Sequence, residues 1–249
     1  MVWSPRTSLA TALAGGLALA SVALAVPAAQ AATPAQPGLY GSADPTYDGA
    51  FRQSLAILAH DAAGTDAPAA AVAWLLGQQC ADGGFQAFRP STSVACTPSD
   101  PDAFAGEDSN STALAALALR SAGRSAEADR AIAWLEAARN ADGGFPYFVG
   151  GASDANSTAD VLIALNGAGA PGSSTSPARH YLETLQLGCD AATTDEDGAL
   201  AFQDYGSGLV ANDAATVQSL VALSGSGLPV APDSSSTAAP RATCPAPVP

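Results

Sequence analysis

The feature that most constrains the fold of this chain is a repeated block of residues. Ala-Val-Ala-Trp-Leu at 71–75 returns as Ala-Ile-Ala-Trp-Leu at 131–135, and Ala-Asp-Gly-Gly-Phe at 81–85 returns unchanged at 141–145. A weaker copy at 178–182 has a tyrosine in place of the tryptophan. Self-similarity at this period predicts small units that cannot bury their apolar faces alone and therefore pack against one another.

Aromatic residues mark the turn of each copy. The first aromatic of each turn is predicted to fill the end of a helical hairpin, and these residues are Phe85, Phe145 and Phe202. The second aromatic follows the turn and is the candidate for lining a ligand site, which selects Phe88, Phe148 and Tyr205. In the third copy, a ten-residue acidic insertion separates the tyrosine of the helix from this turn.

The blocks predict an all-α protein built from repeated helical hairpins. Apolar residues recur at helical spacing, the Ala-rich segments have high helix propensity, and no segment indicates a strand. Ser, Asn, Thr and Asp at 108–112 and 154–158 are typical of helix N-caps, and Asp-Gly-Gly is typical of a turn. We expect helices at 51–62, 68–79, 109–121, 126–139, 156–166, 177–188 and 213–224.

The two ends of the chain differ from its centre. An apolar run from Leu9 to Val26 after Arg6, followed by the Ala-Gln-Ala sequence at 29–31, predicts a cleaved secretory signal; an uncleaved membrane anchor is the alternative. The predicted product is therefore secreted, with no membrane contact once the signal is removed. The expected segments are a signal at 1–31, an irregular flank at 32–48, the repeat domain at 49–225 and a Pro/Ser/Ala-rich tail at 226–249.

The charge and the cysteine content limit the kinds of partner and binding site that are expected. The formal net charge is −14 and the chain has no lysine, so nucleic acid is not an expected partner, because phosphate binding needs clustered cations. Four cysteines in an exported chain favour disulfides over metal binding. Proximity favours the pairs Cys80–Cys96 and Cys189–Cys244, although the sequence allows three connectivities. Neither a metal site nor a cofactor is predicted.

The turn Gln79-Cys-Ala-Asp-Gly-Gly-Phe85 resembles the Gln-x-x-x-Gly-x-aromatic repeat of squalene and terpenoid cyclases and protein prenyltransferases, the α/α-toroid superfamily. The resemblance covers about residues 45–225, and the second copy departs from it with Arg139 in place of the glutamine. It implies an inner and an outer layer of paired helices around a central cavity. Seven helices would form only a partial toroid.

The catalytic motifs of that superfamily are not matched. Class II cyclases carry Asp-x-Asp-Asp-Thr-Ala, whereas this chain has Asn110 and Asn156 at the position of the acid, and an amide cannot protonate an alkene. Asp108 and Asp154 remain as weak catalytic candidates. Prenyltransferases use a zinc site, and the histidine needed for it could come only from His60 or His180, neither of which lies in a matching motif.

We therefore expect a non-catalytic binding or interaction module for a hydrophobic small molecule or a segment of an extracellular protein. The alternative is an enzyme of the terpenoid cyclase or prenyltransferase type with Asp108 or Asp154 as its acid.

Overall fold

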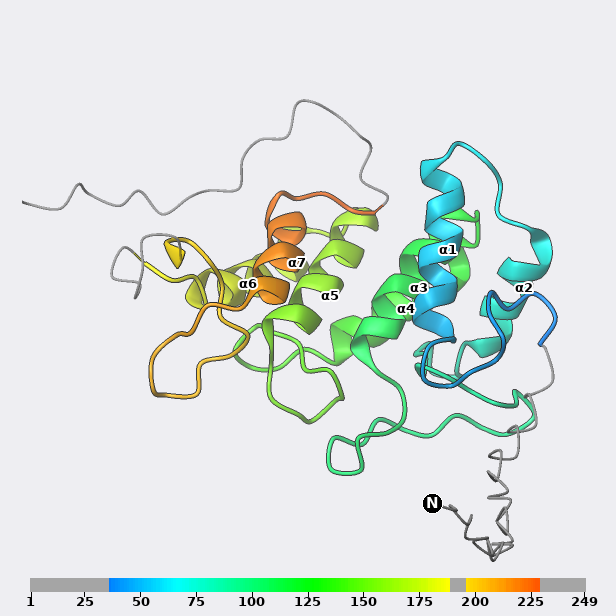
Figure 1. Ribbon diagram of the computed structural model, residues 1–249, viewed down its shortest axis with the longest axis horizontal. Helices are drawn as coiled ribbons and strands as arrows, with labels where there is room; N and C mark the ends of the chain where they lie inside the picture. Colours follow the sequence, from blue (N-terminus) through cyan, green and yellow to red (C-terminus); the bar gives the residue numbers. More distant parts are fainter. Residues whose placement is uncertain (1–35, 189–195, 229–249) are drawn as a thin grey trace, which may run out of the picture. The chain divides into compact units, whose positions relative to one another are not determined.

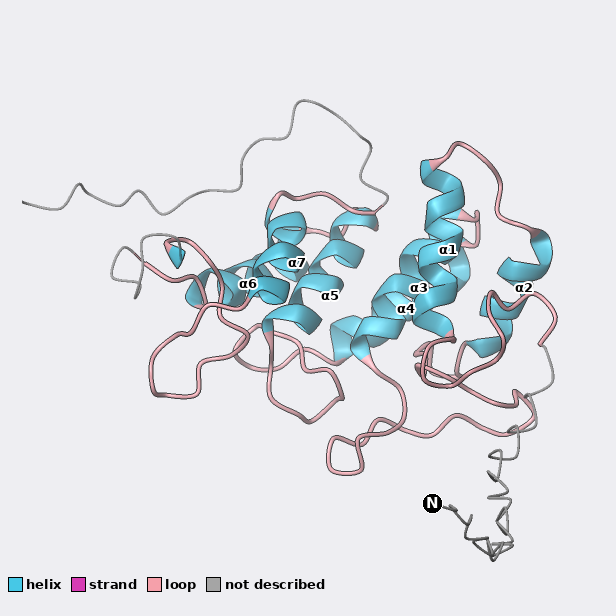
Figure 2. Ribbon diagram, in the orientation of Figure 1, coloured by secondary structure: helices cyan, strands magenta, loops and turns pink. Residues whose placement is uncertain are grey.

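The computed structural model describes residues 36–188 and 196–228, and this part of the chain folds into seven helices joined by turns, with only isolated β-bridges and no strand (Figures 1 and 2). The all-α prediction is confirmed. No helix in these residues is long and apolar enough to cross a membrane. The helices are α1 (Ala50–Ala62), α2 (Ala69–Gln78), α3 (Ser109–Ser121), α4 (Ser125–Ala137), α5 (Ala155–Gly167), α6 (Gly172–Thr184) and α7 (Asp213–Leu223).

Six helices lie within two residues of their predicted bounds, and α6 is the exception. It begins at Gly172 rather than at Pro177, so Pro177 lies inside the helix. A proline has no N–H to donate to the carbonyl four residues earlier, which here belongs to Ser173. The guanidinium of Arg139 donates a hydrogen bond to that carbonyl oxygen at 3.4 Å. A neighbouring segment therefore satisfies the group that the proline leaves free, which is why the helix can continue through it.

Helices α3 and α5 form the middle of the fold. Helices α1, α3, α5 and α7 contact one another in this order, while α2, α4 and α6 pack on α1, α3 and α5 respectively (Figure 1). Every residue is buried at 111–119 in α3 and at 157–165 in α5, so both helices are covered on all sides along these stretches. The alanines in these segments allow neighbouring helices to approach closely.

Each of the first two Asp-Gly-Gly turns is hydrogen-bonded to the start of a helix. The backbone N–H of Phe85 donates to the hydroxyl of Thr112 on α3 at 2.9 Å, and the N–H of Phe145 donates to the hydroxyl of Thr158 on α5 at 2.9 Å. Both phenylalanine side chains are completely buried, as expected for residues that fill the end of a hairpin. The buried hydroxyls of Thr112 and Thr158 therefore link each turn to the start of the following helix.

The third turn makes the same contact through a different residue from the one predicted. The N–H of Leu200, not that of Phe202, donates to the hydroxyl of Thr216 on α7 at 2.9 Å, and Leu200 is completely buried. Phe202 lies two residues further on, is only half-buried, and its carbonyl accepts a hydrogen bond from the N–H of Ala155. The aromatic pattern was misleading because a leucine fills the buried position in this copy.

Residues 36–48, the described part of the predicted irregular flank at 32–48, contact α1 and α2. The N–H of Tyr40 donates to the side-chain oxygen of Gln53 on α1 at 2.8 Å. Gly38 has a φ of +89°, and a Cβ atom there would lie 2.0 Å from the carbonyl oxygen of Ala70 on α2. Residues 36–48 form turns and bends without helix or strand, and these contacts pack them against α1 and α2.

A disulfide joins Cys80, which follows α2, to Cys96 in the loop before α3, with the Cα atoms 5.8 Å apart. This confirms the predicted pair. The other predicted pair, Cys189–Cys244, lies outside the described residues, as do the predicted signal at 1–31 and all of the predicted tail at 226–249 except its first three residues.

We expect Gly83→Ala to destabilise the protein more than Gly64→Ala does. Both glycines have positive φ, so each substitution carries a conformational cost of about 1 kcal/mol. A Cβ at Gly83 would lie 2.5 Å from the carbonyl oxygen of Arg130 on α4, whereas one at Gly64 would have no neighbour within 4 Å. The additional loss for Gly83→Ala should be roughly 1–3 kcal/mol in urea unfolding. Equal losses for the two variants would show that this close approach does not matter.

Candidate functional site

Asp108 and Asp154 are the residues that the sequence offered as candidate acids, and both are helix N-caps. Asp108 accepts a hydrogen bond from the N–H of Ser111 at 2.7 Å, and Asp154 accepts one from the N–H of Ser157 at 2.8 Å. Their exposed fractions are 0% and 4%. The structure therefore confirms the predicted capping role, which satisfies backbone donors that a helix start leaves unpaired.

Burial changes the acidity of these caps. Removal from water raises the pKa of Asp108 to about 7, although hydrogen bonds from Ser111 and Asn110 oppose the shift. Burial also raises the pKa of Asp154 above its ordinary value. One oxygen of Asp108, Oδ2, is buried and has no hydrogen-bond partner in the described part of the chain. A carboxyl in such surroundings stays protonated closer to neutral pH than an exposed one.

A third buried carboxyl, Asp160, was not predicted. It lies in the middle of α5, is 5% exposed, and accepts a hydrogen bond from the side-chain amide of Gln218 on α7 at 2.9 Å. Its pKa is raised to about 7, mainly by burial and also by the charges of Asp154 and Asp108, while the hydrogen bond from Gln218 opposes the shift. The available signal was an acidic residue inside the apolar stretch at 159–165.

The raised pKa values of these three carboxyls suit proton donation. None of them lines any of the three cavities described in this article. Asn156, which occupies one of the positions of the cyclase acid, donates instead to the side chain of Gln218. The geometry therefore favours a structural role for Asp108 and Asp154 at the starts of α3 and α5 and for Asp160 within α5.

The three aromatic candidates are in different surroundings. Phe148 is 6% exposed and packs edge-on against Tyr147 and Phe104, with ring centroids 4.6 and 5.1 Å away. Phe88 is half-buried and does not line a described cavity. Tyr205 is 73% exposed and lines the largest described cavity, which has a volume of about 700 Å³. Of the three, only Tyr205 therefore has a place at a described cavity.

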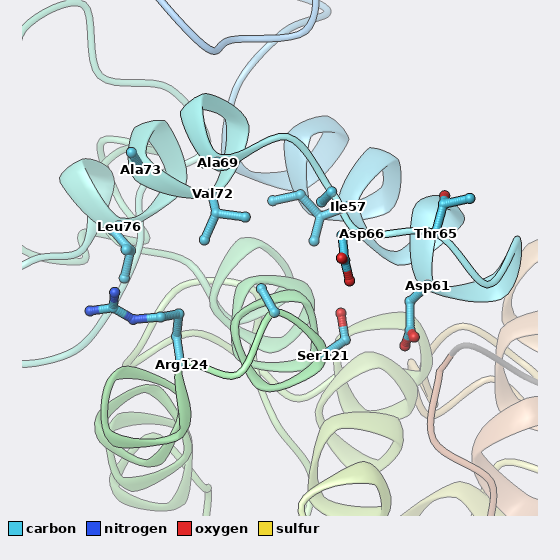
Figure 3. Close-up of a pocket in the computed structure, with 12 residues that line it drawn as sticks. Ile57, Asp61, Thr65, Asp66, Ala69, Val72, Ala73, Leu76, Ser121 and Arg124 are labelled. Carbon is cyan, nitrogen blue, oxygen red and sulfur yellow. The ribbon is translucent and has the colours of Figure 1, made fainter.

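A second cavity, here called the α1–α2 cavity, lies between α1, α2 and the turn that joins α3 to α4, and its volume is about 410 Å³. Figure 3 shows Val72 and Leu76 of α2 pointing toward the segment that carries Ser121 and Arg124. Seven of its twelve lining residues are apolar. The lining residues are Ile57, Asp61, Thr65, Asp66, Ala67, Ala69, Val72, Ala73, Leu76, Ser121, Ala122 and Arg124.

Potential metal ligands gather at one place in the described residues. Side-chain atoms of Cys80, Cys96 and Glu107 lie within 4.8 Å of one another. The disulfide occupies both cysteine sulfurs, and a thiolate is the form of cysteine that binds a metal. This group is therefore not a zinc site while the disulfide is intact.

We expect the protein to lose stability as the pH rises from 5 to 8. A carboxyl whose pKa is higher in the folded than in the unfolded state stabilises the fold while protonated, and this contribution disappears as the pH rises through the folded-state value of about 7. Asp160→Asn removes the ionisation and keeps an oxygen for Gln218. The fall in the free energy of unfolding should be smaller in this variant by roughly 2 kcal/mol.

The control for this experiment is Asp102→Asn, because Asp102 is exposed. Urea unfolding at pH 5 and pH 8 gives the required free energies. If the wild type and Asp160→Asn have the same pH dependence, Asp160 does not titrate in this range.

Comparison with known proteins adds no assignment to this geometry. No protein-family model matches the chain, and no curated protein matches it. The resemblance to the α/α-toroid superfamily therefore remains a prediction from the turn motif, and the function has to be argued from the residues and cavities themselves.

Proposed function

We propose that this protein is an extracellular, non-catalytic binding module whose helical hairpins form part of an α/α toroid. The order of contacts from α1 through α3 and α5 to α7, with α2, α4 and α6 packed on the first three, supports this arrangement. Further support comes from the equivalent hydrogen bonds at Phe85, Phe145 and Leu200, each of which joins a turn to the threonine at the start of a helix.

The α1–α2 cavity is the observation that carries the proposal. Its volume of about 410 Å³ lies in the range of small-molecule sites, and its wall contains Ile57, Val72 and Leu76. A hydrophobic molecule, or an apolar side chain of an extracellular protein segment, would exclude water from this wall. Each square ångström of apolar surface removed from water contributes about 25 cal/mol.

Polar residues surround the same cavity and would orient an occupant. Asp61, Asp66 and Arg124 contribute to its lining and are exposed to solvent. The guanidinium of Arg124 is already paired with Glu127. An occupant with an apolar body and a polar end would place the body against Val72 and leave its polar end among these charges, as is usual where a few polar groups set orientation in an apolar pocket.

An extracellular location is supported by two independent features. The Cys80–Cys96 disulfide is typical of proteins from oxidising compartments, and the first 31 residues have the pattern of a secretory signal.

Catalysis on terpenoid or prenyl substrates is the second candidate, and the raised pKa of Asp108 is the observation in its favour, because a carboxyl that is protonated near neutral pH can act as a general acid. We expect no turnover of squalene or prenyl diphosphates by the wild type. The double variant Asp108→Asn, Asp154→Asn keeps a capping oxygen at both helices. Turnover by the wild type that the double variant lacks would reject the non-catalytic proposal.

The binding proposal predicts that N-phenyl-1-naphthylamine, a neutral apolar fluorophore, gains fluorescence with the wild type and that Val72→Phe reduces this gain severalfold. The larger ring would occupy the cavity. Ile132→Phe is the matched control, because Ile132 occupies the corresponding position of α4 in the repeated block and does not line the cavity. Circular dichroism of both variants is the check that they are folded. An equal fluorescence gain with all three proteins would place the fluorophore elsewhere.

A further inference from the structure

The largest described cavity, here called the α6 cavity, lies between α6, the turn after α4 and the loop after Leu200, with a volume of about 700 Å³. Eight of its twelve lining residues have polar side chains, against five of twelve in the α1–α2 cavity, and two of the eight are carboxylates. The lining of the α6 cavity contains no Arg, Lys or His. The lining residues are Asn140, Ala141, Asp142, Gly151, Ala152, Ser153, Tyr181, Thr184, Leu185, Gln203, Asp204 and Tyr205.

The hydrogen-bond donors of this lining are largely used within the protein. The side-chain amide of Asn140 donates to the carbonyl of Gly151 at 3.0 Å and to the hydroxyl of Ser153 at 2.9 Å. The hydroxyl of Tyr181 and the amide of Gln203 both donate to the carbonyl of Ser153 at 2.8 Å. A ligand would therefore meet few free donors in this cavity.

The acceptors of the lining are not used to the same extent. Oδ1 of Asp142 accepts hydrogen bonds from the N–H of Gly144 and the hydroxyl of Ser153, both at 2.9 Å. Oδ1 of Asp204 accepts one from the N–H of Gly206 at 2.8 Å. The Oδ2 atoms of both carboxylates accept no hydrogen bond from the described residues. The cavity thus offers acceptors and negative charge to whatever enters it.

A smaller cavity, here called the α4 cavity, lies at the corresponding place beside α4. Its aspartate is hydrogen-bonded differently from that of the α6 cavity. There Asp82 corresponds to Asp142, but Oδ2 of Asp82 accepts a hydrogen bond from the indole N–H of Trp134 at 3.2 Å. Tyr181 replaces that tryptophan in the α6 cavity and does not donate to Asp142. The α4 cavity has a volume of about 390 Å³ and is lined by Asp82, Ala133, Trp134, Ala137, Ala138 and Val149.

Two further differences between the cavities add polar groups. By its spacing from Tyr181, Thr184 of the α6 cavity corresponds to Ala137 of the α4 cavity, which has the same spacing from Trp134. Asp204 follows Leu200 by four residues and corresponds to Val149, which follows Phe145 by four. The α6 cavity is therefore the larger and the more negative member of an otherwise similar pair, and its second carboxylate has no counterpart in the lining of the other.

We propose that the α6 cavity binds an organic cation, an ammonium group carried by a small molecule or a peptide side chain. The carboxylates of Asp142 and Asp204 accept its N–H bonds, and charge-assisted bonds of this kind are the strongest class of hydrogen bond in proteins. Tyr205 is 73% exposed, and the face of its ring attracts a cation near the carboxylates.

Other classes of ligand fit the cavity less well. An anion would be repelled by two carboxylates in a lining without a cationic residue. A neutral sugar both donates and accepts hydrogen bonds, and most side-chain donors here are already used. A bound metal ion would need several close ligand atoms, and the group of potential metal ligands found in the described residues lies elsewhere, at Cys80, Cys96 and Glu107.

The test uses 1,5-diaminopentane as the cation, with 1,5-pentanediol and cellobiose as neutral comparisons, and follows amide shifts by NMR with the full secreted protein. We expect saturable shifts at Tyr181, Gln203 and Tyr205 with the diamine alone. Asp204→Asn keeps the acceptor for Gly206 and should weaken binding about tenfold, the loss of one charge-assisted bond. Tyr205→Ala should weaken it severalfold, and Asp82→Asn, in the α4 cavity, should leave it unchanged.

Three outcomes would overturn the proposal. Saturable shifts with cellobiose and not with the diamine would make this a site for sugars. Diamine shifts spread over the acidic surface, and equal in wild type and Asp204→Asn, would show nonspecific attraction to a chain with a formal charge of −14. No shift with any probe would show that the cavity holds none of these ligands. The α1–α2 cavity is lined by different residues, so failure here leaves the apolar binding proposal intact.

Discussion

The hydrogen bond between each glycine turn and the threonine of the following helix start is the interaction on which the rest of the fold depends. Thr112 accepts from the N–H of Phe85 and donates to the carbonyl of Asp108 at 2.6 Å, so one hydroxyl joins the turn, the helix start and the cap. The hydroxyl of Thr158 accepts the corresponding hydrogen bond from the N–H of Phe145. Because this junction is buried, every backbone polar group in it needs a partner, and the threonine hydroxyl supplies one.

Burial also explains why the acidic groups of α3 and α5 are poor candidates for catalysis. Asp108 caps α3 and Asp160 lies within α5 against Gln218 of α7, and water is excluded from both carboxyl groups. Desolvation raises their pKa values, but the packing that causes the shift also leaves no described cavity beside them. The three described cavities lie instead where α2, α4 and α6 meet the turns, and their linings differ.

Much of the fold could be predicted because its signals are local. Helix bounds follow from alanine-rich segments and capping residues, and the Cys80–Cys96 pair follows from proximity in the chain. The position of Leu200 could not be predicted, because leucine carries no turn signal and Phe202 imitated the aromatic pattern.

The candidate site was predictable only in part. Tyr205 was selected for its place after a turn, and it does line a cavity. Neither Val72 nor Asp204 was selected, because a cavity is made by residues distant in the chain, and neither residue is unusual among its neighbours. By itself, the sequence determined the helical hairpins, the caps and the turns, since these depend on residues a few positions apart. Only the tertiary structure decided which carboxylates are buried and which face a cavity, because desolvation and open volume depend on what packs against a side chain.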